Sequence, residues 1–205
     1  MKINYLNFLI LIVISIGVFN LYSCDYIINK KSYKKILKGE SCKTQRYDSI
    51  VYGVKLGMTY DDFYYYMWKE NIDGIFFPSR AGSMVKTNLN EGFKYPVQFE
   101  FFPNNIEGKF IPIKEYKAFI SYQKHSMYNK EMSLDNLLDQ TLSFFEKGYK
   151  GNKFVKIPNN EDIFVKYNYI KIDCNRKISI VPSSALNQLN IFFEDLKPLE
   201  KKDEK

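Results

Sequence analysis

The sequence predicts an α+β fold of two tandem α-β-β-β repeats, each an amphipathic helix packed on an antiparallel sheet. A short motif carries this prediction: Met58 to Phe63 (Met-Thr-Tyr-Asp-Asp-Phe) returns as Met132 to Leu137 (Met-Ser-Leu-Asp-Asn-Leu). Apolar residues at helical spacing follow each copy, and alternating runs rich in aromatic and β-branched residues come after both. The two sheets can also join into one continuous sheet.

Each copy of the motif is expected to begin a helix. Thr59 and Ser133 are suitable N-caps, and Asp61 and Asp135 stand in the positive first turn. After each cap the apolar residues form one stripe, while polar residues fill the other face. The stripes consist of Tyr60, Phe63, Tyr64, Met67 and Trp68 in the first copy, and Leu134, Leu137, Leu138, Thr141, Leu142 and Phe145 in the second.

Three strands are predicted after each helix. They cover Val97–Phe101, Lys109–Ile113 and Tyr116–Tyr122 in the first repeat (48–128), and Ile163–Ile172, Lys177–Val181 and Leu189–Glu194 in the second (129–197). We expect one face of each sheet to be apolar and covered by its helix, and the other to be partly solvated. The stretch 76–91 contains Pro78 and Gly82 without a clear period, so it is predicted as a loop with room for a short strand.

The N-terminal residues follow the pattern of a bacterial lipoprotein signal. Lys2 precedes the apolar run 8–19, and Leu21 and Ser23 occupy positions −3 and −1 before Cys24, as in a lipobox. This predicts a signal peptide over 1–23, lipid on Cys24, and attachment to a membrane of the cell envelope, the outer membrane favoured over the inner. An uncleaved signal anchor is the alternative, because the run 6–22 approaches the about twenty residues of a spanning helix.

Residues 24–47 are predicted to be a lysine-rich tether between the lipid and the folded part. Lys30, Lys31, Lys34, Lys35 and Lys38 crowd a stretch with little apolar periodicity. These lysines can sit near anionic head groups or belong to a solvated linker. At the other end, 198–205 is a charged tail.

With Cys24 lipidated, Cys42 and Cys174 remain as an even pair in an oxidising compartment. A disulfide between them would join the start of the folded region to a turn near its end. Two free thiols are equally compatible with the sequence.

The segment Gly53-Val54-Lys55-Leu56-Gly57-Met58-Thr59-Tyr60-Asp61-Asp62-Phe63 resembles the opening of small bacterial outer-membrane lipoproteins, such as the small accessory lipoprotein of the β-barrel assembly machinery. A tandem version of that unit is similar to the β-lactamase inhibitory proteins. The resemblance implies that Gly57 ends an entering segment, Met58 fills the helix–sheet junction and Thr59 caps the helix. It implies a fold and not a function.

No motif indicates catalysis. The sequence lacks a Gly-rich phosphate loop, HExxH, CxxC and Gly-x-Ser-x-Gly. Asp61, Asp62, Asp135 and Asp139 fit helix-capping and dipole roles better than acid–base or metal roles, and His125, the only histidine, reads as a solvated loop residue. We therefore expect no enzyme, no cofactor and no metal site.

Aromatic residues make up 17% of the chain, and some are expected outside the core. Tyr65 or Tyr66 should point away from the core stripe of its helix, and strand residues straddle both sheet faces. Several aromatic side chains on one open face would form an interaction patch, unless the sheets or the loop 76–91 cover it. The candidate interface residues are Tyr65, Tyr66, Phe102, Tyr167 and Tyr169. Phe119 is a further aromatic residue on a predicted strand.

The chain carries a formal net charge of +7 without a nucleic-acid-binding motif, so nucleic acid is not an expected partner. Together these features predict a membrane-anchored, non-enzymatic lipoprotein that binds another envelope protein, as scaffold, assembly accessory, inhibitor or immunity protein. The alternative is a lipoprotein that binds a small ligand or a polysaccharide through exposed tyrosines.

Overall fold

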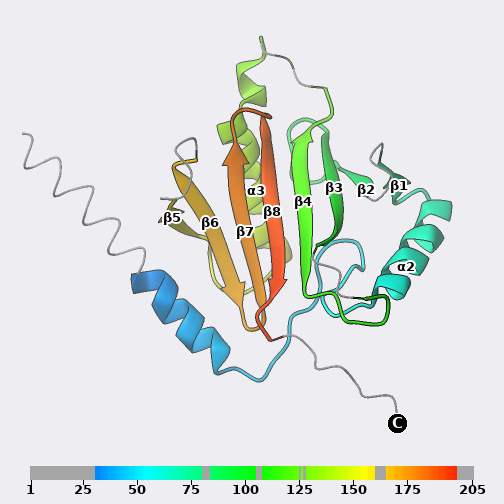
Figure 1. The fold of residues 1–205 in the computed structure, drawn as a ribbon. Helices are drawn as coiled ribbons and strands as arrows, with labels where there is room; N and C mark the ends of the chain where they lie inside the picture. Colours follow the sequence, from blue (N-terminus) through cyan, green and yellow to red (C-terminus); the bar gives the residue numbers. More distant parts are fainter. Residues whose placement is uncertain are drawn as a thin grey trace, which may run out of the picture.

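The computed structural model describes residues 31–79, 84–104, 108–124, 126, 128–159 and 165–197. It confirms the α+β class: helices pack on one eight-stranded antiparallel sheet of order β1-β2-β3-β4-β8-β7-β6-β5 (Figure 1). Cys24, His125 and the tail 198–205 lie outside the described residues.

The first half of the fold begins with α2 (Tyr60–Ile72), which starts where the sequence predicts. The Thr59 hydroxyl accepts a hydrogen bond of 3.1 Å from the N–H of Asp62, which satisfies one of the unpaired donors of the first turn. Four strands follow: β1 (Phe77–Pro78), β2 (Val85–Leu89), β3 (Val97–Asn104) and β4 (Glu115–Tyr122).

The second half repeats this order. After the short 3-10 helix η1 (Lys130–Met132), α3 (Leu134–Gly148) is capped by Ser133, whose hydroxyl accepts from the N–H of Asn136. Then come β5 (Val155–Pro158), β6 (Tyr167–Asp173), β7 (Arg176–Ser183) and β8 (Gln188–Asp195). Pairing of β4 with β8 joins the two halves, so there is one continuous sheet.

Within the described residues, α2 and α3 are thus each followed by four strands and not by the three predicted. The strand expected over Lys109–Ile113 is wrong, because these residues form turns and irregular chain between β3 and β4. There the backbone of Ile113 pairs with Gly57 and Met58, at 3.0 and 2.8 Å, and so fastens the entrance of α2. Instead, β2 lies inside the predicted loop 76–91, and β5 precedes the predicted strand region.

The two faces of the sheet differ in cover. One face carries the core, where Phe63 and Met67 of α2 and Leu137 and Phe145 of α3 meet the alternate residues of β3, β4, β7 and β8. The ring of Phe63 lies 6.0 Å from that of Phe101 in an edge-to-face pair, which adds specific geometry to simple burial. α3 crosses behind the sheet in Figure 1, so the viewer looks onto the other, open face.

Candidate protein-binding surface

The outer side of α2 exposes large apolar side chains. Tyr65, Trp68 and Ile72 are 67%, 63% and 69% exposed, while Phe63 and Met67 fill the core on the opposite side of the same helix. Their spacing of three and four residues places the three exposed side chains along one stripe. We call Tyr65, Trp68 and Ile72 the α2 stripe. The rings of Tyr65 and Trp68 lie 6.1 Å apart, so this surface is apolar and contiguous.

A groove of about 260 Å³ runs beside the α2 stripe, between α2 and the first two strands. We call it the α2–β1 groove. The Asn71 amide in its wall donates a 2.5 Å hydrogen bond to the Phe76 carbonyl and so holds the turn after the helix. Burial, together with the neighbouring Tyr60 hydroxyl, raises the pKa of Tyr64 to about 12, so this phenol is neutral at pH 7. The groove is lined by Tyr64, Met67, Trp68, Asn71, Phe76, Phe77, Pro78, Met84 and Val85.

Tyr66, a predicted interface residue, serves the fold and not the surface. Its hydroxyl donates a 2.7 Å hydrogen bond to the Tyr52 carbonyl, and its ring packs on Phe76. Gly53 allows this approach: its φ is 82°, and a Cβ there would collide with the Tyr66 hydroxyl. Of the Tyr65–Tyr66 pair, only Tyr65 therefore remains free to meet a partner.

A second aromatic group crosses the open face of the sheet. Phe102 and Phe119 lie on neighbouring strands with ring centroids 6.2 Å apart, and Phe192 stands one strand further along. The Lys117 ammonium lies 5.3 Å from the Phe119 ring and 5.6 Å from the Phe192 ring. We call Phe102, Phe119, Phe192 and Lys117 the sheet-face row. All four are half-buried, so the row presents less apolar surface than the α2 stripe.

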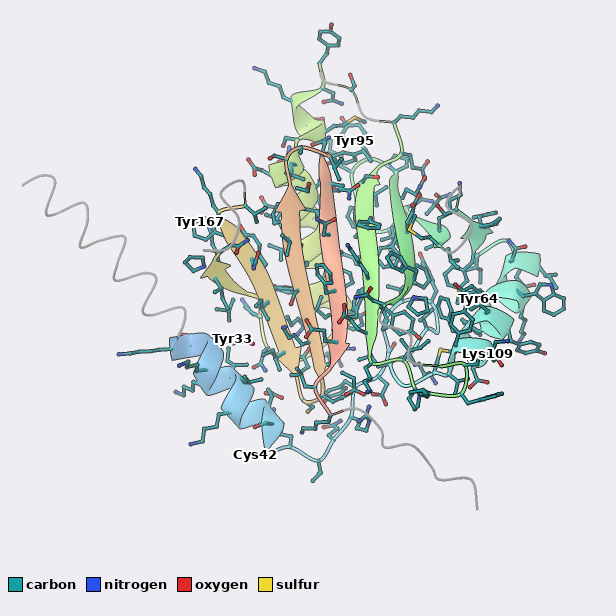
Figure 2. The ribbon with its side chains drawn as sticks, viewed as in Figure 1. Tyr33, Cys42, Tyr64, Tyr95, Lys109 and Tyr167 are labelled. Atoms are coloured by element: carbon teal, nitrogen blue, oxygen red, sulfur yellow. The ribbon has the colours of Figure 1, made fainter. Side chains whose placement is uncertain are left out.

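Tyr167 and Tyr169 do not join this row. Tyr169 lies directly opposite the buried Ile180, so it faces the side of the sheet that α3 covers, and it packs against the core. Tyr167 shares that side, with the Lys156 ammonium 3.9 Å from its ring. Both candidate interface tyrosines therefore lie on the covered side of the sheet and not beside Phe102, and Tyr167 stands near β5 and β6 (Figure 2). The tight turn at Asp173 to Arg176 fixes the register of β6, and residues two apart on a strand share a face.

Cys42 and Cys174 are both free thiols in the structure, which is one of the two alternatives that the sequence left open. Cys42 is exposed, and its thiol lies 3.3 Å from the Lys38 carbonyl. Cys174 is buried in the turn between β6 and β7, with a positive φ of 53°. Burial raises the pKa of its thiol, which stays protonated at neutral pH.

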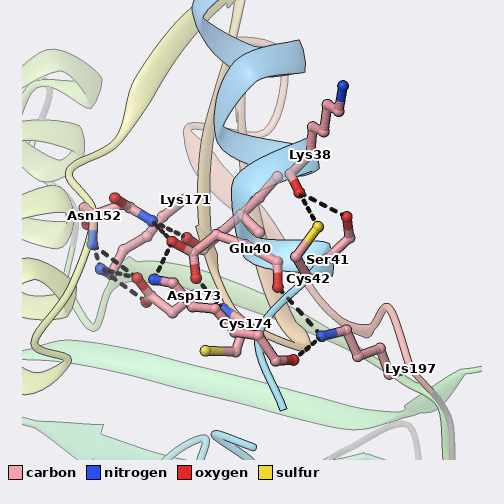
Figure 3. Close-up of polar contacts among 11 residues, drawn as sticks. Lys38, Glu40, Ser41, Cys42, Asn152, Lys171, Asp173, Cys174 and Lys197 are labelled. Carbon is pink, nitrogen blue, oxygen red and sulfur yellow. Dashed lines mark hydrogen bonds and ion pairs between the residues drawn. The ribbon is translucent and has the colours of Figure 1, made fainter. Parts of the chain in front are cut away.

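Glu40 joins the start of the folded region to the β6–β7 turn, the connection that a disulfide would have made. Figure 3 shows its carboxylate accepting from the Cys174 N–H in that turn at 2.7 Å and from the Asn152 amide, ahead of β5, at 2.8 Å. Lys43 adds an ion pair at 2.7 Å. Burial alone would raise the pKa of Glu40, but these hydrogen bonds outweigh it and lower the pKa from 4.5 to about 2. The 6%-exposed carboxylate is therefore charged and fully engaged at pH 7.

Residues 31–47, the described part of the predicted tether (24–47), do not form an extended linker. Residues 31–41 are helical, and Glu40 holds the end of this helix against the sheet. Arg46 follows with a 2.5 Å ion pair to Asp195, and the N–H of Tyr47 bonds the Asn175 side chain at 2.6 Å. A sequence signal was available: Tyr33, Ile36, Leu37 and Glu40 recur at helical spacing.

The described residues offer little catalytic equipment. Asp62 accepts from the Thr59 hydroxyl at 2.7 Å, in the capping role expected for it. Within the part of the chain that the structure describes, no three His, Cys, Asp or Glu side chains gather as a metal site. Across the same ranges, no helix has the length and hydropathy needed to cross a membrane.

Neither a protein-family model, nor a curated protein, nor a solved structure matches this chain.

Proposed function

We propose that this protein is a non-enzymatic, membrane-anchored module of the bacterial envelope that binds another protein through the α2 stripe and the α2–β1 groove. The exposure of Tyr65, Trp68 and Ile72 beside an aromatic groove carries the proposal. Contiguous apolar surface of this kind is uncommon on monomers, and Trp and Tyr dominate the energetic centres of protein interfaces. The occupant is an apolar side chain or short apolar segment of an envelope protein.

The chemistry of the groove favours a protein side chain over a sugar. A sugar site needs polar groups aimed at hydroxyls, whereas this lining is mostly apolar and the Asn71 amide is already engaged by Phe76. Methionine at two lining positions, Met67 and Met84, adds an adaptable wall that suits a protruding aliphatic or aromatic group.

The edge strands of the sheet also favour binding through side chains over binding through backbone strand pairing. The edge strands β1 and β5 have two and four residues, and they end in Pro78 and Pro158. Proline lacks the N–H that a pairing strand would need. Strand addition to either edge is thus disfavoured, which leaves the α2 stripe as the recognition surface.

The anchor belongs to the same proposal. The lipobox Leu21 to Cys24 would place diacylglycerol on Cys24, and several acyl chains hold a protein on a bilayer far more firmly than one. Mass spectrometry of the Cys24 peptide tests this step: a diacylglycerol adduct is expected on the wild-type chain and none on Cys24→Ala. An unmodified Cys24 on a chain that still fractionates with membranes would instead indicate an uncleaved signal anchor.

We also propose that the two halves are tandem copies of one helix-plus-sheet unit. The support is the shared Met-hydroxyl-apolar-Asp motif, the capped helix in each half, and strand orders that mirror each other about the β4–β8 pair. The unit resembles that of the small outer-membrane assembly lipoproteins and, in tandem, the β-lactamase inhibitory proteins.

One observation favours the alternative of a polysaccharide or small ligand. A shallow depression of about 570 Å³ lies on the open face near β1, where Phe77 stands beside amide and ammonium groups. An aromatic ring next to amides can hold a sugar. The depression is lined by Phe77, Pro78, Lys86, Asn88, Gln98, Gln123 and Lys124.

Site-specific photo-crosslinking in the native host separates the two functions. A photoreactive residue at position 68 is expected to give one adduct of defined mass, and the same probe at Tyr128, which is 95% exposed, serves as the control. Adducts of the same pattern and yield from both positions would contradict the α2 surface. A third probe at Asn88, in the shallow depression, tests the alternative function. Adducts to polysaccharide from this position alone would favour a polysaccharide-binding protein.

A further inference from the structure

The helix over 31–41 has two chemically distinct faces. Its packed side carries Tyr33, Ile36, Leu37 and Glu40, which are half-buried or buried. The other side carries Lys31, Lys34, Lys35 and Lys38, all exposed, at spacings of three, one and three residues. These four lysines therefore share one side of the helix, and we call them the lysine stripe.

The direction of the lysine stripe is fixed relative to the sheet. Glu40 joins the helix end to Cys174 and Asn152, and the Lys197 ammonium donates a 3.2 Å hydrogen bond to the Glu40 carbonyl. In Figure 3 the Lys38 side chain extends away from this network while Glu40 points into it. The lysine stripe thus faces outward from a docked helix.

We infer that the lysine stripe lies on the anionic head groups of the bilayer that anchors the chain, and so sets the orientation of the whole domain. The inference rests on the membrane anchoring proposed above. Four ammonium groups on one side, with no acid between them along the stripe, are complementary to an anionic phospholipid surface.

The position of the stripe selects the membrane over an acidic protein. Lys31 lies seven positions after Cys24, and a chain of that length spans at most about 25 Å when fully extended. The uncleaved alternative, with the apolar run 8–19 in the bilayer, also ends near the same place. In either case the first lysine of the stripe is kept close to the lipid surface.

The attraction between the lysine stripe and an anionic leaflet is strong enough to orient the domain. A lysine near an anionic leaflet strengthens association by about fivefold. The stripe is about 10 Å long, close to the screening length of about 8 Å at physiological salt, so all four ammonium groups can act together. Added salt should weaken the effect, because it shortens that length.

This orientation places the α2 stripe far from the bilayer. The helix docks near β5 and β6 at one edge of the sheet, and α2 lies at the other edge, beside β1 (Figure 1). Seven strand spacings of about 4.8 Å separate the two edges by about 33 Å. The recognition surface would therefore project away from the membrane that holds the chain.

Lysine labelling tests the contact. The full chain is incorporated into vesicles of phosphatidylcholine, or of phosphatidylcholine with phosphatidylglycerol, and acylated with a water-soluble ester. Lys31, Lys34, Lys35 and Lys38 should react about fivefold more slowly in the anionic vesicles, and high salt should remove the protection. The exposed Lys109 and Lys147 are the internal controls and should react equally in both. Equal reactivity of the stripe in both vesicles would overturn the inference.

The single tryptophan reports the orientation. With a fluorescence quencher on the lipid head groups, Trp68 should stay unquenched in the anionic vesicles. Replacing the four stripe lysines by Gln should increase the quenching, because the domain is released to tumble. The matched control replaces Lys109, Lys130, Lys147 and Lys150 by Gln and should leave Trp68 unquenched. Strong quenching of the wild-type chain would contradict the orientation.

The two proposals fail in different ways. A chain that does not stay on either vesicle contradicts both the anchor and the orientation. A chain that stays bound but shows no lysine protection contradicts the stripe alone. Cross-linking of the α2 surface to a protein partner is unaffected by either result.

Discussion

The carboxylate of Glu40 accepts a 2.7 Å hydrogen bond from the N–H of Cys174, 134 residues further along the chain. This contact joins the first described helix to the turn between β6 and β7. It converts the segment after the predicted lipid into part of the folded domain. Residues 31–48 are thereby held against the sheet and do not form a free linker.

Glu40→Gln should loosen this connection. All three partners of the carboxylate, the Cys174 N–H, the Asn152 amide and the Lys43 ammonium, are donors, whereas a carboxamide offers one acceptor and one donor group. We expect a loss of about 2 kcal/mol in the docking of the helix. Hydrogen exchange over 31–41 measures it, with Glu91→Gln, an exposed carboxylate between β2 and β3, as control. Equal protection in both variants would contradict the role of Glu40.

Docking of the helix should also depend on pH. The pKa of Glu40 is lowered from 4.5 to about 2 in the folded chain, so its stabilisation is complete above about pH 4.5. It is lost as pH falls from about 4.5 towards 2, because in this window the Glu40 carboxylate takes up a proton when the helix is undocked but not when it is docked. Protection factors over 31–41 should decline in that window, more steeply in the wild-type chain than in Glu40→Gln. If the protection factors of the wild-type chain and of Glu40→Gln decline in parallel, Glu40 is not the titrating group.

Neighbouring tyrosines on α2 should respond differently to loss of a hydroxyl. Tyr66→Phe removes the hydrogen bond to the Tyr52 carbonyl and should lower the free energy of unfolding by about 1 kcal/mol. Tyr65→Phe changes an exposed side chain and should stay within about 0.5 kcal/mol of the wild type. Urea unfolding compares the two. A larger loss for Tyr65→Phe would contradict the assignment of their roles.

The two thiols should differ in reactivity. Alkylation of the native chain, followed by peptide mass spectrometry, should modify the exposed Cys42 quickly and the buried Cys174 only in denaturant. The raised pKa of Cys174 adds to this difference, because the thiolate is the reactive form. A linked Cys42–Cys174 peptide in the unreduced protein would show that the disulfide forms after all.

Local signals in the sequence predicted where α2 and α3 begin. Thr59 and Ser133 are the N-caps of α2 and α3, because a cap depends only on a hydroxyl and the three residues after it. The α+β class followed from alternation, and one continuous sheet was an alternative that the sequence left open. β2 was expected only as a possible short strand within a loop although Val85, Thr87 and Leu89 alternate, because Pro78 and Gly82 beside it are typical loop residues.

Non-local features could not be predicted in the same way. The face on which Tyr169 lies depends on the register of β6 with β7, which the turn at Cys174 fixes. Phe192 joins Phe102 and Phe119 only because β8 pairs with β4 across the two halves of the chain. The helix over 31–41 was not predicted, because its lysines are typical of a solvated linker. Its packed face ends in the charged Glu40, whose partner Cys174 is distant in the sequence.

The most direct test of the central claim combines a photo-crosslinking probe at position 65 with Trp68→Ala, in the native host. Loss of Trp68 from the centre of the α2 stripe should weaken partner binding by about thirtyfold or more, as for a typical interface hot spot, and the adduct from position 65 should nearly vanish. Tyr128→Ala, which removes another exposed aromatic side chain away from α2, should leave that adduct unchanged. An undiminished adduct in Trp68→Ala would contradict recognition through α2.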